Sequence, residues 1–455
     1  MKLIFKFLII AVLSFLFFFK LHFTALTSYD EAWYADISRN LAVTKNPFEL
    51  IFNYSRFTDH PPLGFMLMSV PPLFIANQEL TARIVPAFLG MLSIVLIYLS
   101  GKKISGPFVG LGAGAILLSS MWFMLRARSG NLDIIFLFGL MLSFYGLLKL
   151  KESQKYLYLA TLGFIFAFLT KTLLGAGLLP VFIYSFWKNR HILKRSTILA
   201  NLILVLVLIT PWYLYNQLVD SNFLYHHFIE IGVRGESNAF QPSALKTSFL
   251  YLQVGIGKWY KLFFASIILS GFIWFKSKID REKLIMIYLV LFGFALPLLF
   301  SSQVEVWHLI PVYFPIALLI AFVLIRTAQL CQNKLKYLPL LITFFILSLS
   351  AWQFYAFSNL IYPQTGEFSS EKNIAQKASA YPSIHLMSYF YPAAVYYSGS
   401  KVIPVWFSEN SYQEMQSLLN GVNVFIIDQQ LFQDLERDKI PFSVIYNNEQ
   451  YYLIK

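Results

Sequence analysis

Charged residues and cysteines are both scarce in this sequence. Only 13% of the 455 residues are Asp, Glu, Lys or Arg, about half of the roughly 25% that is usual for soluble domains. The mean hydropathy of +0.60 and the hydrophobic content of 57% therefore exclude a soluble protein and indicate an integral membrane protein. The single cysteine, Cys331, excludes an internal disulfide and a cysteine-based metal site.

The sequence has few acidic residues to balance its basic ones, and the formal net charge is +13. In a soluble protein such a surplus would suggest a nucleic-acid partner. In a membrane protein it fits the accumulation of Lys and Arg in cytoplasmic loops. We therefore expect membrane lipids as partners, and no nucleic acid.

Long apolar runs separated by short charged loops predict an all-α polytopic fold with about eleven membrane-spanning helices. The first run has a basic start but no small-residue cleavage site, so we expect an uncleaved helix and not a signal peptide. The expected spans are roughly 4–22, 82–100, 107–125, 131–148, 156–170, 172–187, 197–216, 259–275, 284–301, 307–325 and 337–357.

The distribution of basic residues predicts the orientation. With the N-terminus inside, all five inner loops are basic: GKK (101–103), KLKESQK (149–155), WKNRHILKR (187–195), FKSKIDREK (275–283) and RTAQLCQNKLK (326–336). This orientation places the loops 23–81 and 217–258 and the tail 358–455 outside. We therefore expect a multi-pass protein of the inner (cytoplasmic) membrane with a cytoplasmic N-terminus and an extracytoplasmic C-terminal region.

The tail is more polar and predicts a small α/β domain at 358–455, after a transmembrane domain at 1–357. SIHLMSY (383–389), KVIPVW (401–406) and VNVFIID (422–428) are typical of strands, and 391–398, 411–421 and 429–437 are typical of helices. The last residues, 442–455, predict a hairpin with Asn447 and Asn448 at its turn.

Two adjacent carboxylates, Asp30 and Glu31, follow the first apolar run. The segment DEAWYADISRNLAV has helical periodicity and predicts an amphipathic helix lying in the membrane interface, with Trp33 on its apolar stripe and Asp36 facing away. An Asp at the start of a helix often caps it. Helix capping accounts for Asp30 but not for Glu31, so a functional role of this carboxylate pair is the alternative.

A second polar cluster, Asp59 and His60, precedes two prolines in the same loop. A residue before proline avoids the helical region, so an extended entry and then an apolar interfacial helix from about Leu63 are expected. The first outer loop thus holds two interfacial helices, each opened by a polar cluster, and this arrangement is consistent with a functional cleft.

Cations also occur on the outer side, where the charge distribution disfavours them. Arg126, Arg128 and Lys171 lie in short outer loops. Charge near a span boundary usually needs a partner. These cations either reach lipid headgroups, or pair with Asp133, or form a basic pocket for an anionic lipid phosphate.

The order of these motifs resembles the dolichyl-phosphate-mannose protein mannosyltransferase superfamily of C-type (GT-C) membrane glycosyltransferases, and in particular its bacterial branch, which includes the lipid A aminoarabinose transferases. The resemblance covers roughly residues 25–325. It is carried by YDEAWYADISRNL, TDHPPLGFML, RSGNLDIIFLFGLML, FLTKTLLGAGLLP, TPWYLYNQ…NFLYHHFIEIGVRG and WHLIPVYFPIALLIA.

The resemblance implies an outward-facing inverting transferase whose donor is a sugar on a polyprenyl phosphate. Asp30 would be the general base or would orient the acceptor, with Glu31 beside it or at a metal. Cationic contacts would stabilise the leaving phosphate. The residues expected at the donor phosphate or substrate are His60, Asp59, Arg126, Arg128, Lys171, Arg234 and His308.

The sequence also departs from the family pattern. Ile231 stands where several relatives have His, Thr172 where they often have Gly, and His308 where many have Tyr. No cofactor is certain, and a divalent metal remains an alternative, with Glu31, Asp59 and Glu230 as its candidate ligands.

We expect a polyprenyl-phosphate-dependent glycosyltransferase that acts on a lipid or a cell-surface glycan. No Walker loop or dinucleotide fingerprint is present, which fits a lipid-linked donor. A protein O-mannosyltransferase is the alternative within the family. A glycolipid flippase or transporter would place polar residues in mid-membrane, and an inert sensor or scaffold would not need Asp30, Lys171 and Arg234.

Overall fold

The computed structural model describes residues 2–233, 242–299, 304–331, 335–363, 369–405 and 423–455. The chain divides into two compact units. Unit 1 comprises residues 1–19, 58–64 and 86–362, and unit 2 comprises 20–57, 65–85 and 363–455. Most of the first outer loop is thus grouped with the C-terminal segment, and each unit is described separately below.

Unit 1 is built from helices that follow the apolar runs of the sequence. In chain order they are α1 (Lys2–Phe18), the later part of α4 (Gln78–Ser105), α5 (Pro107–Leu118), α6 (Met121–Ala127), α7 (Asp133–Lys149), α8 (Tyr156–Phe168), α9 (Thr172–Gly175), η2 (Ala176–Leu178), α10 (Leu179–Asn189), α11 (Arg195–Val219), α12 (Phe223–Tyr225), η3 (His226–Val233), α13 (Pro242–Ile256), α14 (Trp259–Lys276), α15 (Lys278–Leu299), η5 (Val306–Leu309), α16 (Ile310–Leu330) and α17 (Leu338–Ile361).

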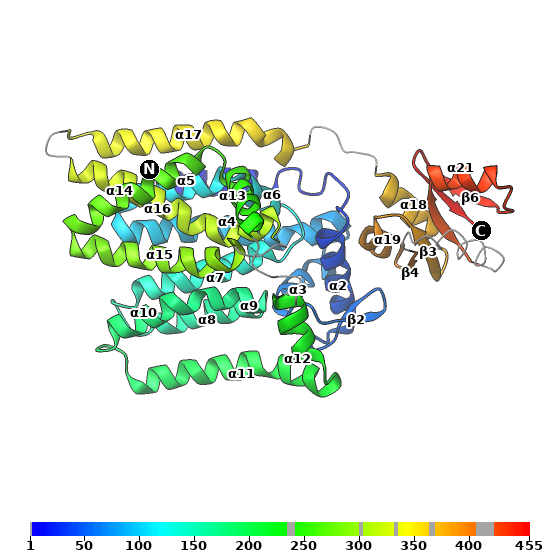
Figure 1. Ribbon diagram of the computed structural model, residues 1–455, viewed down its shortest axis with the longest axis horizontal. Coiled ribbons are helices and arrows are strands. Elements are labelled where there is room, and N and C mark those ends of the chain that lie inside the picture. Colours follow the sequence, from blue (N-terminus) through cyan, green and yellow to red (C-terminus); the bar gives the residue numbers. More distant parts are fainter. Residues whose placement is uncertain (1, 234–241, 300–303, 332–334, 364–368, 406–422) are drawn as a thin grey trace. The chain divides into compact units, whose positions relative to one another are not determined.

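The centre of unit 1 is α16. Almost every residue of this helix is buried, and it packs against α5, α7, α14, α15 and α17. In Figure 1, α16 lies next to α17 and α15, and α8 lies next to α11. A helix that is apolar on all sides is expected to lie in the core of a bundle. Its neighbours α14, α15 and α17 keep large apolar side chains exposed, as lipid-facing helices do.

Every expected span corresponds to at least one helix, but the helices differ in length. Among the described residues, five helices are long and apolar enough to cross a membrane, or seven if two bent pairs each count as one span. The bent pairs are α5 with α6, at 74°, and Ala244–Ile256 with α14, at 107°. The helices α1, α7, α8 and α10 have 17 residues or fewer. The count of eleven spans therefore stays a prediction.

The helices α7 and α8 approach each other closely through glycines. A Cβ atom added to Gly163 would lie 2.3 Å from the backbone nitrogen of Ser143, and one added to Gly146 would lie 2.6 Å from the nitrogen of Ala160. Small residues let the backbones of membrane helices come this close. Because α7 and α8 are consecutive and antiparallel, this packing brings the start of α7 next to the end of α8.

Unit 2 combines most of the first outer loop with the C-terminal segment. Its loop part holds α2 (Asp30–Thr44), the hairpin β1 (Leu50–Phe52) and β2 (Ser55–Phe57), most of α3 (Leu63–Met68), η1 (Pro71–Leu73) and the start of α4. Its C-terminal part holds α18 (Ser370–Ala378), β3 (Ser383–Met387), α19 (Tyr391–Ser398), β4 (Lys401–Pro404), β5 (Phe425–Asp428), α21 (Gln429–Arg437), β6 (Val444–Asn447) and β7 (Tyr451–Ile454).

The C-terminal strands form one mixed sheet in the order β4-β3-β5-β7-β6. The strand β3 is parallel to both β4 and β5, and β7 is antiparallel to β5 and β6. The predicted α/β character of the tail is therefore confirmed, including the terminal hairpin, in which the backbone N–H of Asn448 donates to the Tyr451 carbonyl. The helix predicted at 411–421 lies outside the described residues.

The helix predicted in the first loop is confirmed as α2, but the expected exposure of its polar face is wrong. Asp36 is only 2% exposed. Its carboxylate accepts hydrogen bonds from Arg39 and Asn40, and Arg39 donates to the Tyr396 carbonyl of α19. Tertiary packing against the C-terminal segment thus covers the face that periodicity alone assigns to solvent.

We predict that Gly163→Ala destabilises the protein, because the new methyl group has to displace the α7 backbone. Overpacking of this kind costs about 1–3 kcal/mol. Gly271→Ala is the matched control: Gly271 also lies within a helix, and a Cβ atom there meets nothing within 4 Å. Thermal unfolding in detergent should show a lower Tm for Gly163→Ala and an unchanged Tm for Gly271→Ala. Equal Tm values for the two variants would contradict the close α7–α8 contact.

Candidate functional site

A buried ion cluster in unit 1 joins three residues from three segments. Asp133, at the start of α7, accepts from Arg126 Nε at 2.8 Å and from Lys171 Nζ at 2.5 Å. The side chains of Asp133, Lys171 and Arg126 are 5%, 11% and 12% exposed. Removing three charges from water is costly unless they pair, so the cluster is held by its own mutual contacts.

The loop between α6 and α7 fixes the carboxylate of this cluster. Asn131 is fully buried. Its side-chain oxygen accepts from the Asp133 backbone N–H at 2.9 Å, and its amide donates to the carbonyls of Arg126 and Ser129. Lys171 immediately precedes α9 in an extended conformation. The close α7–α8 packing then sets the separation between Asp133 and Lys171.

The cluster has more positive than negative charge. One carboxylate, Asp133, contacts two cations, Lys171 and Arg126. The Arg126 guanidinium also lies over the Trp307 ring, 5.3 Å from its centroid. Such a surplus in a poorly hydrated place attracts an anion, and a phosphate oxygen is the usual partner of Lys and Arg. The sequence indicates Asp133 only as an ion-pair partner of these cations, and its position at the centre of the cluster is seen only in the structure.

His60 lies in the electrostatic environment of this cluster. The backbone N–H of Leu63 donates to the Leu169 carbonyl at 3.1 Å, which ties the 58–62 segment to the end of α8. Part of the His60 side chain remains exposed. Its surroundings nevertheless desolvate the ring, and the positive charge of Lys171 acts in the same direction, so the pKa of His60 falls to about 3. His60 is therefore neutral at physiological pH.

A hydrogen-bonded chain next to Lys171 was not foreseen from the sequence. His227 Nδ1 lies 2.8 Å from the Thr58 carbonyl oxygen and therefore carries the donated hydrogen. Its Nε2 lies 2.7 Å from Thr172 Oγ1, which lies 2.6 Å from the Tyr213 hydroxyl. Burial lowers the pKa of His227, in agreement with a neutral ring that donates at Nδ1 and accepts at Nε2. The chain ties the 58–60 segment to the residue after Lys171.

A second histidine bridges two of the candidate metal ligands. His226 Nδ1 lies 2.6 Å from Glu230 Oε2, and His226 Nε2 lies 3.2 Å from Asp59 Oδ1. Within the described ranges, no group of three or more His, Cys, Asp or Glu side chains is arranged to hold a metal ion. Metal binding by Glu31, Asp59 or Glu230 stays a prediction.

In unit 2, Glu31 anchors the start of α2. Its two oxygens accept from Arg83 Nε at 2.7 Å and Arg83 Nη2 at 3.0 Å, and Oε2 also accepts from the backbone N–H and hydroxyl of Thr27. Glu31 and Arg83 are 3% and 5% exposed. Arg83 further donates to the carbonyls of Leu21, Thr24 and Ala25. Three of these donors contact Oε2 and one contacts Oε1, so both oxygens of Glu31 are engaged by Arg83 and Thr27.

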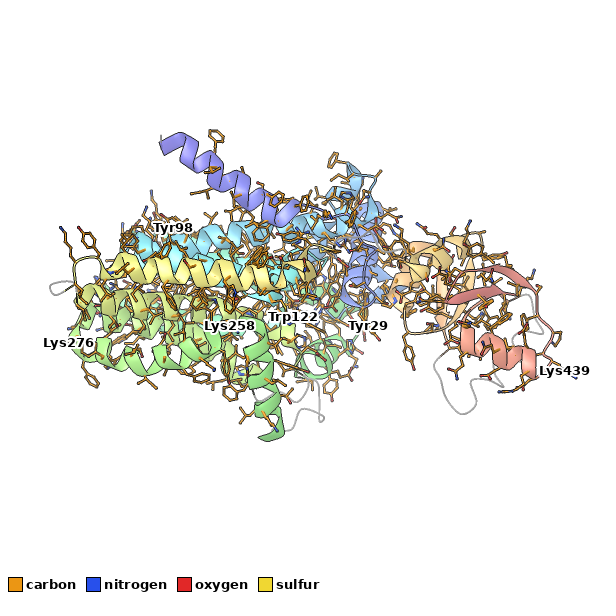
Figure 2. All side chains as sticks on the ribbon, turned by 90° about the horizontal axis from the view of Figure 1, so that it is seen from above. Tyr29, Tyr98, Trp122, Lys258, Lys276 and Lys439 are labelled. Carbon is orange, nitrogen blue, oxygen red and sulfur yellow. The ribbon has the colours of Figure 1, made fainter. Side chains whose placement is uncertain are left out.

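Asp30 is placed differently from its neighbour. It is the first residue of α2, but the capping position belongs to Tyr29, which has a positive φ of 66°. Asp30 is thus the first helical residue and not the N-cap residue that the alternative explanation assumed. Asp30 is partly exposed, and Tyr29 is 62% exposed at the surface of unit 2 (Figure 2). A partly exposed carboxylate can still be reached by a substrate.

Two further candidates contact backbone groups, and the charge of one of them, His308, also acts on His60. Arg128 donates to the carbonyls of Phe17 at 2.8 Å and Phe19 at 2.6 Å, and lies over the Tyr362 ring, which fits a structural role at the end of α1. His308 Nδ1 accepts the backbone N–H of Glu305 at 3.0 Å in the capping box of η5. Arg234 lies outside the described residues.

The fold and the first half of the sequence are similar to GT-C glycosyltransferases. The family model for dolichyl-phosphate-mannose-protein mannosyltransferase matches residues 59–215. The fold matches that of ArnT from Cupriavidus metallidurans in its apo state, with a TM-score of 0.77 and 14% identity over 99% of this chain and 97% of that one. An oligosaccharyltransferase from Archaeoglobus fulgidus gives a TM-score of 0.60 at 12% identity, over 93% of this chain and 69% of that one.

Two curated relatives match parts of the chain. An uncharacterized protein of Aquifex aeolicus is 27% identical over 50% of this chain, and an undecaprenyl phosphate-α-4-amino-4-deoxy-L-arabinose arabinosyl transferase of Pseudomonas fluorescens is 28% identical over 40% of it. The matched regions span 47% and 35% of those relatives. The resemblance to GT-C glycosyltransferases that include the aminoarabinose transferases is therefore confirmed.

We predict that the contact between His226 and its two carboxylates weakens at high pH. Burial disfavours the protonated ring, but Glu230 and Asp59 outweigh it, so the pKa of His226 is raised above 6.5. The stabilisation of the fold by the contacts of protonated His226 is thus complete below pH 6.5, and it is lost as the pH rises through the raised pKa of His226. The reason is that a neutral ring has only one N–H for two carboxylates. Amide hydrogen exchange at 226–233, corrected for intrinsic rates, should be faster at pH 9 than at pH 6.

His226→Asn provides the control for this pH effect, since it removes the titrating group and leaves Asp59 and Glu230 in place. Exchange in this variant should not change between the two pH values after correction. Equal protection at both pH values in the unmodified protein would contradict the assignment of His226 as the titrating link.

Proposed function

We propose that the protein is an inverting glycosyltransferase that moves a sugar from a polyprenyl-phosphate donor to a lipid or a cell-surface glycan at the outer face of the cytoplasmic membrane. The observation that carries this proposal is the buried cluster in which Asp133 contacts both Lys171 and Arg126. A donor phosphate would supply the negative charge that this cluster lacks. The ArnT structure bound to undecaprenyl phosphate, which has the same fold with a TM-score of 0.75, supports the donor class.

In the proposed reaction the acceptor hydroxyl oxygen attacks the anomeric carbon of the sugar. The bond from that carbon to the phosphate oxygen breaks, and its electron pair leaves with the polyprenyl phosphate. Negative charge therefore grows on the phosphate in the transition state, where Lys171 and Arg126 would stabilise it. His60, neutral at physiological pH, would contact the phosphate or the acceptor through a hydrogen bond and add no charge.

The proton of the acceptor hydroxyl also needs a base, and we assign this role to Asp30. A carboxylate within hydrogen-bond reach takes the proton as the new bond forms. Its neighbour Glu31 already accepts four hydrogen bonds from Arg83 and Thr27, so it is less suited to that task. In this assignment Glu31 holds the start of α2, and Asp30 performs the chemistry.

The proposed topology has the transmembrane domain at 1–357 with about eleven spans, and the C-terminal domain at 358–455 outside. The five basic loops support this orientation. Donor sugars carried on a membrane lipid need no nucleotide at the outer face, which agrees with the lack of a nucleotide-binding motif.

We predict that Lys171→Met weakens binding of undecaprenyl phosphate and slows transfer, because one of the two cations that contact Asp133 is lost. Loss of one donor to developing charge typically reduces kcat by about 10²–10³-fold. Binding of undecaprenyl phosphate to the purified protein measures the first effect. Lys261→Met, at an exposed position of α14, removes the same charge and should bind normally. Unchanged affinity in Lys171→Met would reject the phosphate contact.

A complementation experiment in cells tests Asp30 as the base. A deletion strain should accumulate a lipid-linked sugar, and a surface glycan should lose the corresponding mass. Asp30→Asn should fail to restore transfer, with a loss of roughly 10²–10⁴-fold, while binding of undecaprenyl phosphate by the purified variant stays normal. Full restoration by Asp30→Asn would remove Asp30 from the mechanism.

The topology predicts opposite labelling of two cysteines. Cys331 is exposed and lies in an expected inner loop, so an impermeant maleimide should label it only after cell lysis. Glu436→Cys, at an exposed position of α21, should be labelled in intact cells when it is combined with Cys331→Ser. Labelling with the opposite preference at both positions would show that the orientation is inverted.

A further inference from the structure

A second basic cluster surrounds a cavity in unit 1 that the proposed reaction does not use. The cavity has a volume of about 200 Å³, far above the roughly 10–15 Å³ that one water needs. Its polar lining consists mainly of Lys103 from α4, Lys151 from the α7–α8 turn, Ser185 and Lys188 from α10, and Glu282 and Lys283 from α15. Four of the five basic loops predicted to lie inside thus contribute to one cavity.

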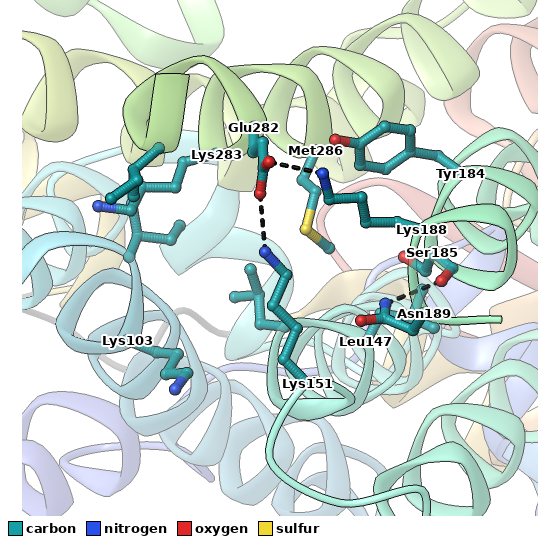
Figure 3. A pocket seen from close by; sticks show the side chains of 13 residues that line it. Lys103, Leu147, Lys151, Tyr184, Ser185, Lys188, Asn189, Glu282, Lys283 and Met286 are labelled. Carbon is teal, nitrogen blue, oxygen red and sulfur yellow. Dashed lines mark hydrogen bonds and ion pairs between the residues drawn. The ribbon is translucent and has the colours of Figure 1, made fainter. Parts of the chain in front are cut away.

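The carboxylate of Glu282 organises this cavity. Lys188 Nζ lies 2.6 Å from Glu282 Oε1, and Lys151 Nζ lies 2.7 Å from Glu282 Oε2. Figure 3 shows both lysine side chains extending toward Glu282 from different segments. Each ammonium group has three N–H donors, so each retains donors for a further acceptor.

Positive charge exceeds negative charge around the cavity. Lys103 and Lys149 share Glu152, and Lys283 and Arg326 share Asp280. Lys103 and Lys283 line the cavity with Lys151, Lys188 and Glu282, and the whole ion-pair group has six cations and three carboxylates. Every carboxylate in the group is shared by two cations, so the cluster as arranged has a surplus of three positive charges.

A polar group on the cavity wall also lacks a partner. The Ser185 hydroxyl is buried and makes no hydrogen bond within the part of the chain that the structure describes, and Ser185 itself is 1% exposed. Ser185 lies one helical turn before Lys188 on α10, so hydroxyl and ammonium group lie on the same side of the helix. A buried hydroxyl without a partner costs free energy, and an anionic acceptor in the cavity would remove that cost after a small adjustment of the side chain.

The cavity lies at the ends of membrane-spanning helices. Lys103 is near the end of α4, and Glu282 and Lys283 are near the start of α15; both helices are long and apolar enough to span a bilayer. Residues at these positions are at the level of lipid headgroups. Basic pockets between membrane helices on the cytoplasmic side are suited to anionic headgroups.

We infer that this cavity binds the phosphate headgroup of an anionic phospholipid. The phosphate is held by Lys151 and Lys188, with Lys103 and Lys283 on either side, while the acyl chains remain in the bilayer. A site here is separate from the Asp133 cluster, which lies at the opposite end of α7. The lipid fixes the α10 and α15 ends to the α7–α8 turn and stabilises the bundle that carries the transferase site.

The experiment measures lipid binding to the full-length protein by native mass spectrometry in a neutral detergent, with phosphatidylglycerol, phosphatidylcholine and inorganic phosphate as separate probes. We expect phosphatidylglycerol to bind and to raise Tm. Lys151→Gln with Lys188→Gln should weaken this binding by about 25-fold, since each lysine near a membrane surface contributes about fivefold. The result does not depend on the membrane orientation or on transferase activity.

Two controls make the outcome specific. Lys401→Gln with Lys439→Gln removes the same net charge at exposed positions of unit 2 and should leave binding unchanged. Glu282→Gln frees both lysines and should strengthen binding. Equal weakening by the two double variants, or weaker binding in Glu282→Gln, would overturn the proposal. Inorganic phosphate that binds as tightly as phosphatidylglycerol would overturn the lipid as the source of the phosphate.

Discussion

The close approach of α7 and α8 is the constraint on which the Asp133 cluster depends. Gly146 and Gly163 allow the two backbones to touch, and the helix pair is antiparallel. The first residue of α7, Asp133, therefore meets Lys171, three residues after α8 ends. No flexible loop has to bring these charges together, because they are fixed at adjacent ends of one rigid pair. A buried ion cluster tolerates little displacement, since an unpaired charge in such surroundings costs several kcal/mol.

The charges of the cluster agree with the anionic ligand of the proposed function. The Glu31–Arg83 pair of unit 2 balances one carboxylate with one cation. At Asp133 a second cation is present, and His60 nearby is kept neutral by burial and by the charge of Lys171. The positive charge is thus concentrated on two side chains. The chain from Thr58 through His227 to Thr172 then holds the segment that carries His60 against the segment that carries Lys171.

Hydropathy and turn chemistry were sufficient to predict most of the elements, because each depends on local sequence. Helices occupy every expected span, α2 and α3 begin at Asp30 and Leu63, and the strands of the tail lie where alternation placed them. The sequence did not predict which groups would pair across long distances in the chain. Glu31 finds Arg83 52 residues away, and the polar face of α2 is covered by α19. Asp133, His226 and His227 gain their importance from such contacts, which periodicity cannot encode.

The adjacent carboxylates Asp30 and Glu31 show how structure separates two residues that look equivalent in sequence. Glu31 is buried, and its four hydrogen bonds are directed inward to Arg83 and Thr27; they order the start of α2. The helical turn of about 100° per residue then directs the preceding side chain away from that anchor, and Asp30 remains partly exposed. A general base has to be held firmly while its oxygen stays accessible to a substrate. An anchored Glu31 next to a partly exposed Asp30 meets both requirements, because in the proposed reaction the residue that fixes the backbone would not be the residue that exchanges the proton.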